Sequence, residues 1–83
     1  MVVSGRVQGV FFRDTIRNAA DREGVAGWVR NNPDGTLEAV FEGDPAAVER
    51  LVSLSRQGPP GARVQGVEGF EEPEERMQGF RIR

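Results

Sequence analysis

The sequence predicts an α+β domain in which strands and helices follow one another as β-α-β-β-α-β, with a short final strand. Three observations lead to this prediction. Two stretches carry apolar residues at helical spacing, and each is bounded by residues that begin or end helices. Between them lie two extended runs joined by an Asn-Pro-Asp-Gly turn, which indicates a hairpin. This order is the split βαβ, or ferredoxin-like, arrangement, whose mixed sheet carries both helices on one face.

The first elements expected along the chain are a short strand over 1–7 and a helix over 12–23. The strand is brief, which leaves open whether its start is truncated. The apolar residues that follow are spaced i, i+4, i+7 and i+8, which is one face of a helix. They are Phe12, Ile16, Ala19 and Ala20. Asp14 suits the positive end of the helix dipole, and Gly24 is the expected C-cap.

The hairpin is predicted next, with strands over 25–31 and 36–42. The turn over 32–35 contains a proline that fixes φ and an Asp-Gly pair that suits the tight positions. Apolar and acidic residues alternate in the second strand, so one of its faces is expected to be buried. That face carries Leu37, Ala39 and Phe41. Trp28, the one tryptophan, is expected in the core, and the alternative is that it forms the wall of a pocket.

The second helix is predicted to begin after Asp44, a favourable N-cap, with Pro45 at the first helical position. It is expected to run to about Arg56. Its inward face carries Val48, Leu51, Val52 and Ser55. A loop rich in glycine and proline then precedes an extended stretch over 62–70, whose internal glycines indicate a bulge.

The end of the chain is predicted to hold an acidic loop over 71–75 and a last strand over 77–83. The loop is interpreted as solvated, because it lacks the ligand spacing of a calcium loop. In the strand, Phe80 and Ile82 are expected to point inward. The length of 83 residues favours one domain over 1–83.

The composition narrows the chemistry that is possible. The chain has no cysteine, histidine or lysine, which excludes disulfides, thiolate metal sites, His-based nucleophile pairs and Schiff bases. A net charge of -2 argues against nucleic-acid binding. No apolar run approaches the roughly 20 residues of a membrane span, and no signal peptide is apparent. We therefore expect a cytoplasmic protein without nucleic-acid or membrane partners. We also expect a monomer without a cofactor, but nothing in the composition determines the oligomeric state.

The stretch over 4–13 has the character of an anion site, because it leads from a strand through glycines into a helix. Gly5 and Gly9 permit turns or a close backbone approach. The first N–H groups of a helix lack internal partners and carry partial positive charge, which suits a phosphate. Arg13 in the first turn adds a planar guanidinium fork. The alternative is a tight turn beside a surface arginine, and spacing alone favours that alternative.

Asn31 is the second candidate site residue, because the first two strands are parallel and end at the same edge of the sheet. One inserted strand separates their ends, which should lie about 10 Å apart. A carboxamide at this place can hold a water molecule without titrating. The alternative is that Asn31 is simply part of the turn that follows.

Several segments together resemble the acylphosphatase family. They are GRVQGVFFR at 5–13, GWVRN at 27–31, PDG at 33–35, EG at 42–43 and GPPGARV at 58–64. The resemblance covers nearly the whole chain, and it implies metal-independent hydrolysis of acyl phosphates to a carboxylate and inorganic phosphate. It also implies that Arg13 binds the phosphate and that Asn31 orients the water. The backbone amides that would surround the phosphate belong to Gln8, Gly9, Val10, Phe11 and Phe12. Nothing in the sequence identifies the acyl group.

Two other functions stay open at this point. One is a non-catalytic module of the same fold that binds anions or partners, as acylphosphatase-like modules do within larger maturation enzymes. The other is an RNA-binding module, which would need exposed aromatic residues on the middle strands and a basic sheet face. Phe41 is the one aromatic residue of the third strand and is expected on its apolar side, so this function is disfavoured.

Overall fold

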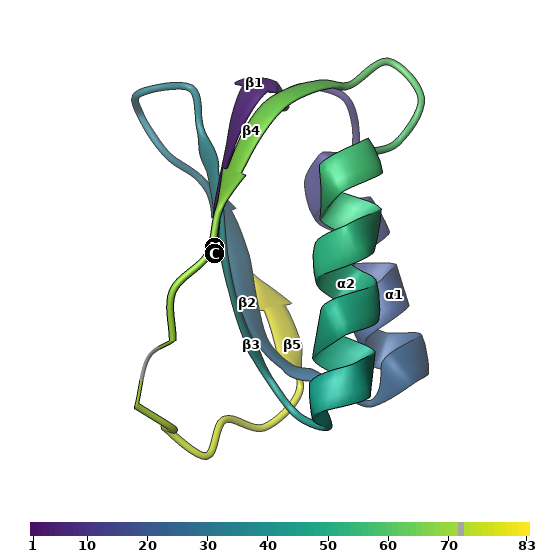
Figure 1. Ribbon diagram of the computed structural model, residues 1–83, viewed down its shortest axis with the longest axis vertical. Helices are drawn as coiled ribbons and strands as arrows, with labels where there is room; N and C mark the ends of the chain where they lie inside the picture. The colour runs from purple at the N-terminus through teal and green to yellow at the C-terminus, as the bar shows by residue number, and fades with distance from the viewer. Residues whose placement is uncertain (72) are drawn as a thin grey trace.

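The computed structural model of the chain describes residues 1–71 and 73–83. Within this part, five strands and two helices form two layers, a mixed sheet with both helices on one face (Figure 1). The elements are β1 (Val2–Arg6), α1 (Phe12–Glu23), β2 (Ala26–Asn31), β3 (Leu37–Glu42), α2 (Pro45–Gln57), β4 (Arg63–Glu68) and β5 (Phe80–Ile82). The predicted ferredoxin-like fold is therefore confirmed.

The order of the strands decides which loops meet. The sheet runs β4-β1-β3-β2-β5, and β3 pairs antiparallel with both β1 and β2. Strands β1 and β2 are therefore parallel, as predicted, and their carboxyl ends lie at the same edge of the sheet. Strand β4 pairs antiparallel with β1, and β5 pairs parallel with β2, so these two form the outer edges.

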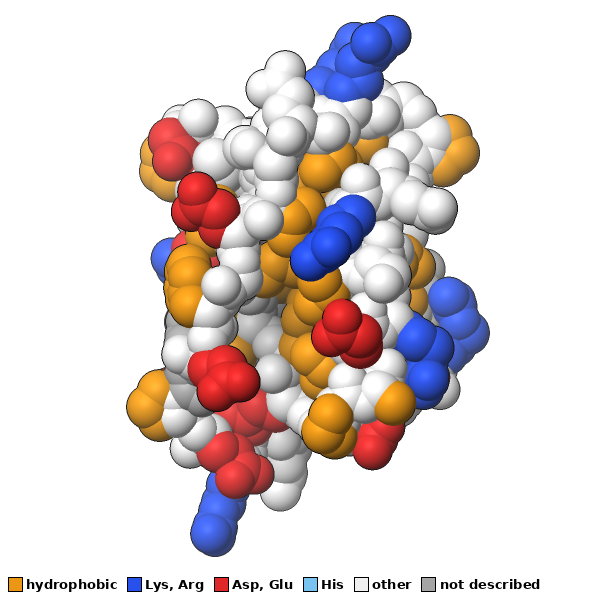
Figure 2. Space-filling view, in the orientation of Figure 1, with side chains coloured by type: hydrophobic (Ala, Val, Ile, Leu, Met, Phe, Trp, Pro, Cys, Tyr) orange, Lys and Arg blue, Asp and Glu red, His pale blue; other side chains and the backbone are white. Residues whose placement is uncertain are grey.

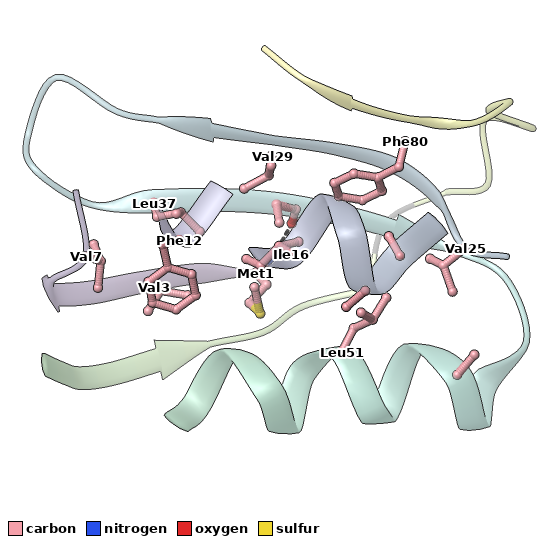
Figure 3. Packing of buried hydrophobic residues seen from close by; sticks show 14 residues of the cluster. Met1, Val3, Val7, Phe12, Ile16, Val25, Val29, Leu37, Leu51 and Phe80 are labelled. Atoms are coloured by element: carbon pink, nitrogen blue, oxygen red, sulfur yellow. Dashed lines mark hydrogen bonds between the residues drawn. The ribbon is translucent and has the colours of Figure 1, made fainter. Parts of the chain in front are cut away.

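The first helix has the predicted bounds and buries the predicted face. Its buried residues are Phe12, Ile16, Ala19 and Ala20. Figure 3 shows the ring of Phe12 lying near Val3 and Leu37, in the core between the helices and the sheet. Gly24 ends the helix in the left-handed region at φ 69°, and its N–H is bonded to the last carbonyls of the helix.

The hairpin of β2 and β3 leaves no room for a side chain at Gly27. A β-carbon there would lie 1.8 Å from the carbonyl oxygen of Val40 on the partner strand, and φ is 138°. Only glycine permits this close approach. It keeps β2 in register with β3, with Asn31 opposite Leu37 at the end of the pair.

Trp28 corrects the sequence prediction, because it is not a core residue. Successive side chains of a strand point to opposite faces. Val29 is fully buried in the core, so Trp28 lies on the sheet face away from the helices and is half-buried. The guanidinium carbons of Arg30 and Arg83 lie 5.0 and 4.6 Å from its ring centroid and cover it in part.

The second helix begins and packs as predicted. The Asp44 carboxylate accepts a hydrogen bond from the Ala47 N–H at 3.2 Å, and the helix runs one residue further than expected, to Gln57. Leu51 and Ser55 are buried, and the Ser55 hydroxyl donates to the Leu51 carbonyl oxygen at 2.8 Å. A buried hydroxyl is thus satisfied within the helix itself.

The last two strands are shorter than predicted, and the pairing explains why. Strand β4 ends at Glu68 because its partner β1 begins opposite it, at Val2. A register shift opposite Ser4 and Gly5 leaves Gln65 as an extra residue, which confirms the predicted bulge. Strand β5 covers Phe80–Ile82 alone.

The segment before β5 is bonded to a side chain instead of a strand. The backbone N–H groups of Glu75 and Met77 donate to the Glu42 carboxylate at 2.6 and 2.8 Å. The expected strand over 77–83 therefore begins later. Of the acidic loop over 71–75, Glu71, Glu74 and Glu75 are exposed as expected, and residue 72 lies outside the described residues.

Candidate active site

The loop between β1 and α1 contains two residues in the left-handed region. Gly9 has φ 71°, and Phe11, the N-cap of α1, has φ 61° and ψ 24°. Left-handed residues among right-handed ones turn successive N–H groups toward one concavity, the geometry known to bind anions. The N-cap side chain makes no capping hydrogen bond. Gly9 and Phe11 therefore give the loop a feature that is common in anion-binding loops.

A hollow of about 350 Å³ lies beside this loop. It is lined by Val7, Gly9, Phe11, Phe12, Arg13, Asp14, Asn31 and Ile82. The structure thus brings Arg13 and Asn31 to one hollow, together with three of the predicted loop residues. Gln8 and Val10 belong to the same loop but do not line the hollow.

Arg13 lies at the hollow with its charge available. Within the described residues its guanidinium pairs with no carboxylate. Asp14 also lines the hollow and would repel an anion, but its carboxylate lies 3.4 Å from the Arg17 guanidinium, which offsets its charge. The local field therefore favours an anion beside Arg13.

Asn31 contributes a buried oxygen to the site. Its Oδ1 is inaccessible to solvent and has no hydrogen-bond partner among the described residues. A buried acceptor without a partner costs about 1–3 kcal/mol, and such atoms in folded proteins call for an explanation. Asn31 also lines the hollow, and a carboxamide can bind water by donating or by accepting a hydrogen bond.

Gln8 joins the loop to the hairpin turn. Its side-chain Nε2 donates to the carbonyl oxygens of Asn32 at 2.8 Å and Thr36 at 3.0 Å. These bonds fix the loop against the turn that follows Asn31, so they set the position of Arg13 relative to Asn31. Sequence reasoning assigned Gln8 only a backbone amide, since no local pattern indicates a contact to the turn.

Glu38 holds the residues on either side of Asn31, Arg30 and Asn32, in one hydrogen-bonded network. Arg30 Nη2 donates to the Glu38 carboxylate at 2.9 Å, Arg30 Nε donates to Asn32 Oδ1 at 3.1 Å, and Asn32 Nδ2 donates to Glu38 at 3.3 Å. Burial raises the pKa of Glu38, but hydrogen bonds from Arg30 and Asn32 outweigh it, so the pKa lies below its usual value. The sequence pattern indicated only an exposed strand position for Glu38.

The stability of the hairpin should depend on the ionisation of Glu38. A pKa lowered by folding contributes stability above the ordinary carboxyl range and loses it as the pH falls through the folded-state value. We expect the free energy of unfolding to fall from about pH 5 to about pH 3, and Glu38→Gln to flatten that fall. Urea unfolding at a series of pH values measures this. If the free energy of unfolding of the variant falls with pH as steeply as that of the wild type, Glu38 does not cause the pH dependence.

A larger hollow of about 410 Å³ lies elsewhere, along the seam between the sheet and α2, where Figure 2 shows a band of apolar side chains. Its lining includes Phe41, Val48, Val52 and Phe70, and its charged side chains among the described residues are those of Glu42 and Glu71. No arginine of the described structure lines this hollow, whereas Arg13 and Asn31 line the smaller one, so the smaller of the two is the candidate active site. The described part of the chain contains no group of three or more acidic side chains placed to share a metal ion. Neither helix in residues 1–71 and 73–83 is long and apolar enough to cross a membrane.

Comparisons with known proteins agree with one another. The sequence model of the family described as acylphosphatase matches residues 1–82. An acylphosphatase of Rubrobacter xylanophilus is 61% identical over 82 residues, which are 98% of this chain and 74% of that protein. An acylphosphatase of Gloeobacter violaceus is 62% identical over 73 residues, which are 87% of this chain and 78% of that protein. The structure of an acylphosphatase from Coxiella burnetii aligns with a TM-score of 0.94 at 39% identity, covering 99% of this chain and 86% of that one.

Proposed function

The chain belongs to the acylphosphatase family, and from this premise we propose that Arg13, Asn31 and the backbone amides over 8–12 carry out its reaction. As an acylphosphatase it is a hydrolase that converts an acyl phosphate to a carboxylate and inorganic phosphate. The observation that supports the proposed roles is the shared hollow, in which Arg13 and Asn31 meet although they come from different elements.

The phosphate is held by charge and by backbone donors. The Arg13 guanidinium offers two parallel N–H donors to two phosphate oxygens, and the loop amides bind the remaining oxygens. These donors stay in place as negative charge shifts during the reaction, so they stabilise the transition state as well as the substrate. Most catalysis of phosphoryl transfer comes from this positioning and charge stabilisation.

Asn31 positions the attacking water. Its carboxamide, which lines the hollow, hydrogen-bonds the water and turns a lone pair of the water oxygen toward phosphorus. As the new P–O bond forms, the bond from phosphorus to the acyl oxygen breaks, and the carboxylate leaves with the electron pair. A water proton passes to a phosphate oxygen of the substrate, because the sequence has no histidine, lysine or cysteine to accept it.

The proposed chemistry predicts turnover that needs no metal. Purified protein should release inorganic phosphate from benzoyl phosphate and from acetyl phosphate at the same rate with and without a metal chelator. Arg13 and the loop amides supply the charge stabilisation in this mechanism, so removing metal ions should change the rate less than about twofold. Loss of turnover with the chelator, restored by one added metal, would contradict the mechanism. Absence of turnover in both conditions would favour the non-catalytic module instead.

The substrate class follows from the family, whereas the cytoplasmic location and the monomeric state stay predictions of the sequence. One observation favours the rival RNA-binding function. Trp28 is an aromatic residue on the outer sheet face, where such a module would need one. The net charge of -2 still opposes it.

A further inference from the structure

Phe11 has a backbone conformation that glycine would adopt without strain. It occupies the left-handed region at φ 61°, where bulky residues are outliers. The same loop meets the same requirement with a glycine at Gly9, where φ is 71°. The bend itself therefore does not call for a phenylalanine.

Packing does not explain the side chain of Phe11 either. The side chain is 80% exposed, so its burial offsets little of the strain. By contrast the neighbouring Phe12 is 1% exposed and belongs to the core. An exposed aromatic ring on a strained residue at a functional site indicates a use in binding.

The position of Phe11 indicates what it binds. It lines the same hollow as Arg13 and Asn31, together with the apolar side chain of Ile82. Its carbonyl oxygen accepts hydrogen bonds from the Thr15 N–H at 3.0 Å and the Thr15 hydroxyl at 2.9 Å, which fix the residue at the start of α1. The backbone of Phe11 is thus anchored, and its ring is an exposed apolar surface next to the place where the phosphate is proposed to lie.

We propose that Phe11 selects substrates through their acyl group, so that acyl phosphates with an aromatic or large apolar acyl group are hydrolysed in preference to acetyl phosphate. This inference rests on the proposed function of the hollow. With the phosphate held by Arg13 and the loop amides, in-line attack requires the acyl group to project away from the water. An apolar acyl group at the rim then covers the ring of Phe11 and removes both surfaces from water.

The test compares two substrates in the same variant. In Phe11→Gly, the ratio of kcat/KM for benzoyl phosphate to kcat/KM for acetyl phosphate should fall about 3- to 10-fold, as expected for losing one aromatic contact. The variant should also unfold at a temperature a few degrees higher, because glycine relieves the strain. Phe11→Ala should lower the ratio without this thermal gain. Phe70→Ala is the matched control, since Phe70 is 58% exposed but lies outside the hollow, and it should leave the ratio unchanged.

The outcomes separate this inference from the function on which it depends. If both Phe11 variants hydrolyse both substrates with the wild-type ratio, the selection by Phe11 is wrong and the proposed function stands. A lower unfolding temperature in Phe11→Gly would overturn the premise that the residue is strained. If the wild-type protein hydrolyses neither substrate, the proposed function itself fails.

Discussion

Arg13→Lys is expected to lower kcat/KM for benzoyl phosphate by roughly 100- to 1,000-fold, the loss typical of removing one preorganised donor to a developing charge. Lysine keeps the positive charge but presents a single ammonium group, which cannot bind two phosphate oxygens at once. Because Arg13 pairs with no carboxylate in the described structure, its replacement should leave the free energy of unfolding nearly unchanged. Initial rates over a range of substrate concentrations, together with urea unfolding, measure both effects.

The control for this variant is Arg22→Lys, which makes the same change in the last turn of α1, outside the hollow. It should change kcat/KM by less than about twofold, in line with an exposed surface substitution. Near wild-type activity in Arg13→Lys would show that a point charge suffices and would overturn the bidentate role.

Asn31→Ala is expected to reduce kcat by about 100-fold or more while inorganic phosphate inhibits the variant nearly as well as the wild type. The amide orients water and does not bind the phosphate, so its loss raises the barrier without weakening the anion site. Because this oxygen has no partner among the described residues, its removal should not lower the free energy of unfolding by more than about 1 kcal/mol. Steady-state kinetics with phosphate as inhibitor separates these effects.

Asn18→Ala serves as the matched control, because Asn18 is exposed on α1 and does not line the hollow. Its kcat should stay at the wild-type value. If Asn31→Ala instead kept its kcat and lost affinity for phosphate, Asn31 would be a phosphate ligand and the water would need another partner.

Much of the fold could be predicted because local signals agree with the tertiary structure. Helix α1 is bounded as the apolar spacing and Gly24 indicate, and the turn over 32–35 joins β2 and β3 as its proline and glycine require. Because β1 and β2 run parallel on either side of β3, Arg13 and Asn31 come to the same edge of the sheet, so the topology predicts the candidate site before any contact is known.

The errors arise where a long-range contact decides the outcome. Trp28 and Val29 are both apolar, and only the position of the helices determines which of them is buried. The last strand begins late because the carboxylate of Glu42 binds the preceding backbone. The Gln8 side chain donates hydrogen bonds to the turn between β2 and β3, 24 and 28 residues further along the sequence. Local sequence patterns do not predict these contacts, because each contact joins residues that are far apart in the sequence.

A crystal structure of the protein with bound phosphate tests the central claim most directly. We expect phosphate within hydrogen-bond distance of the Arg13 guanidinium and the amides over 8–12, with a water bound to the Asn31 carboxamide and facing phosphorus. A phosphate bound elsewhere at saturating concentration, with the hollow beside α1 free of it, would contradict the account.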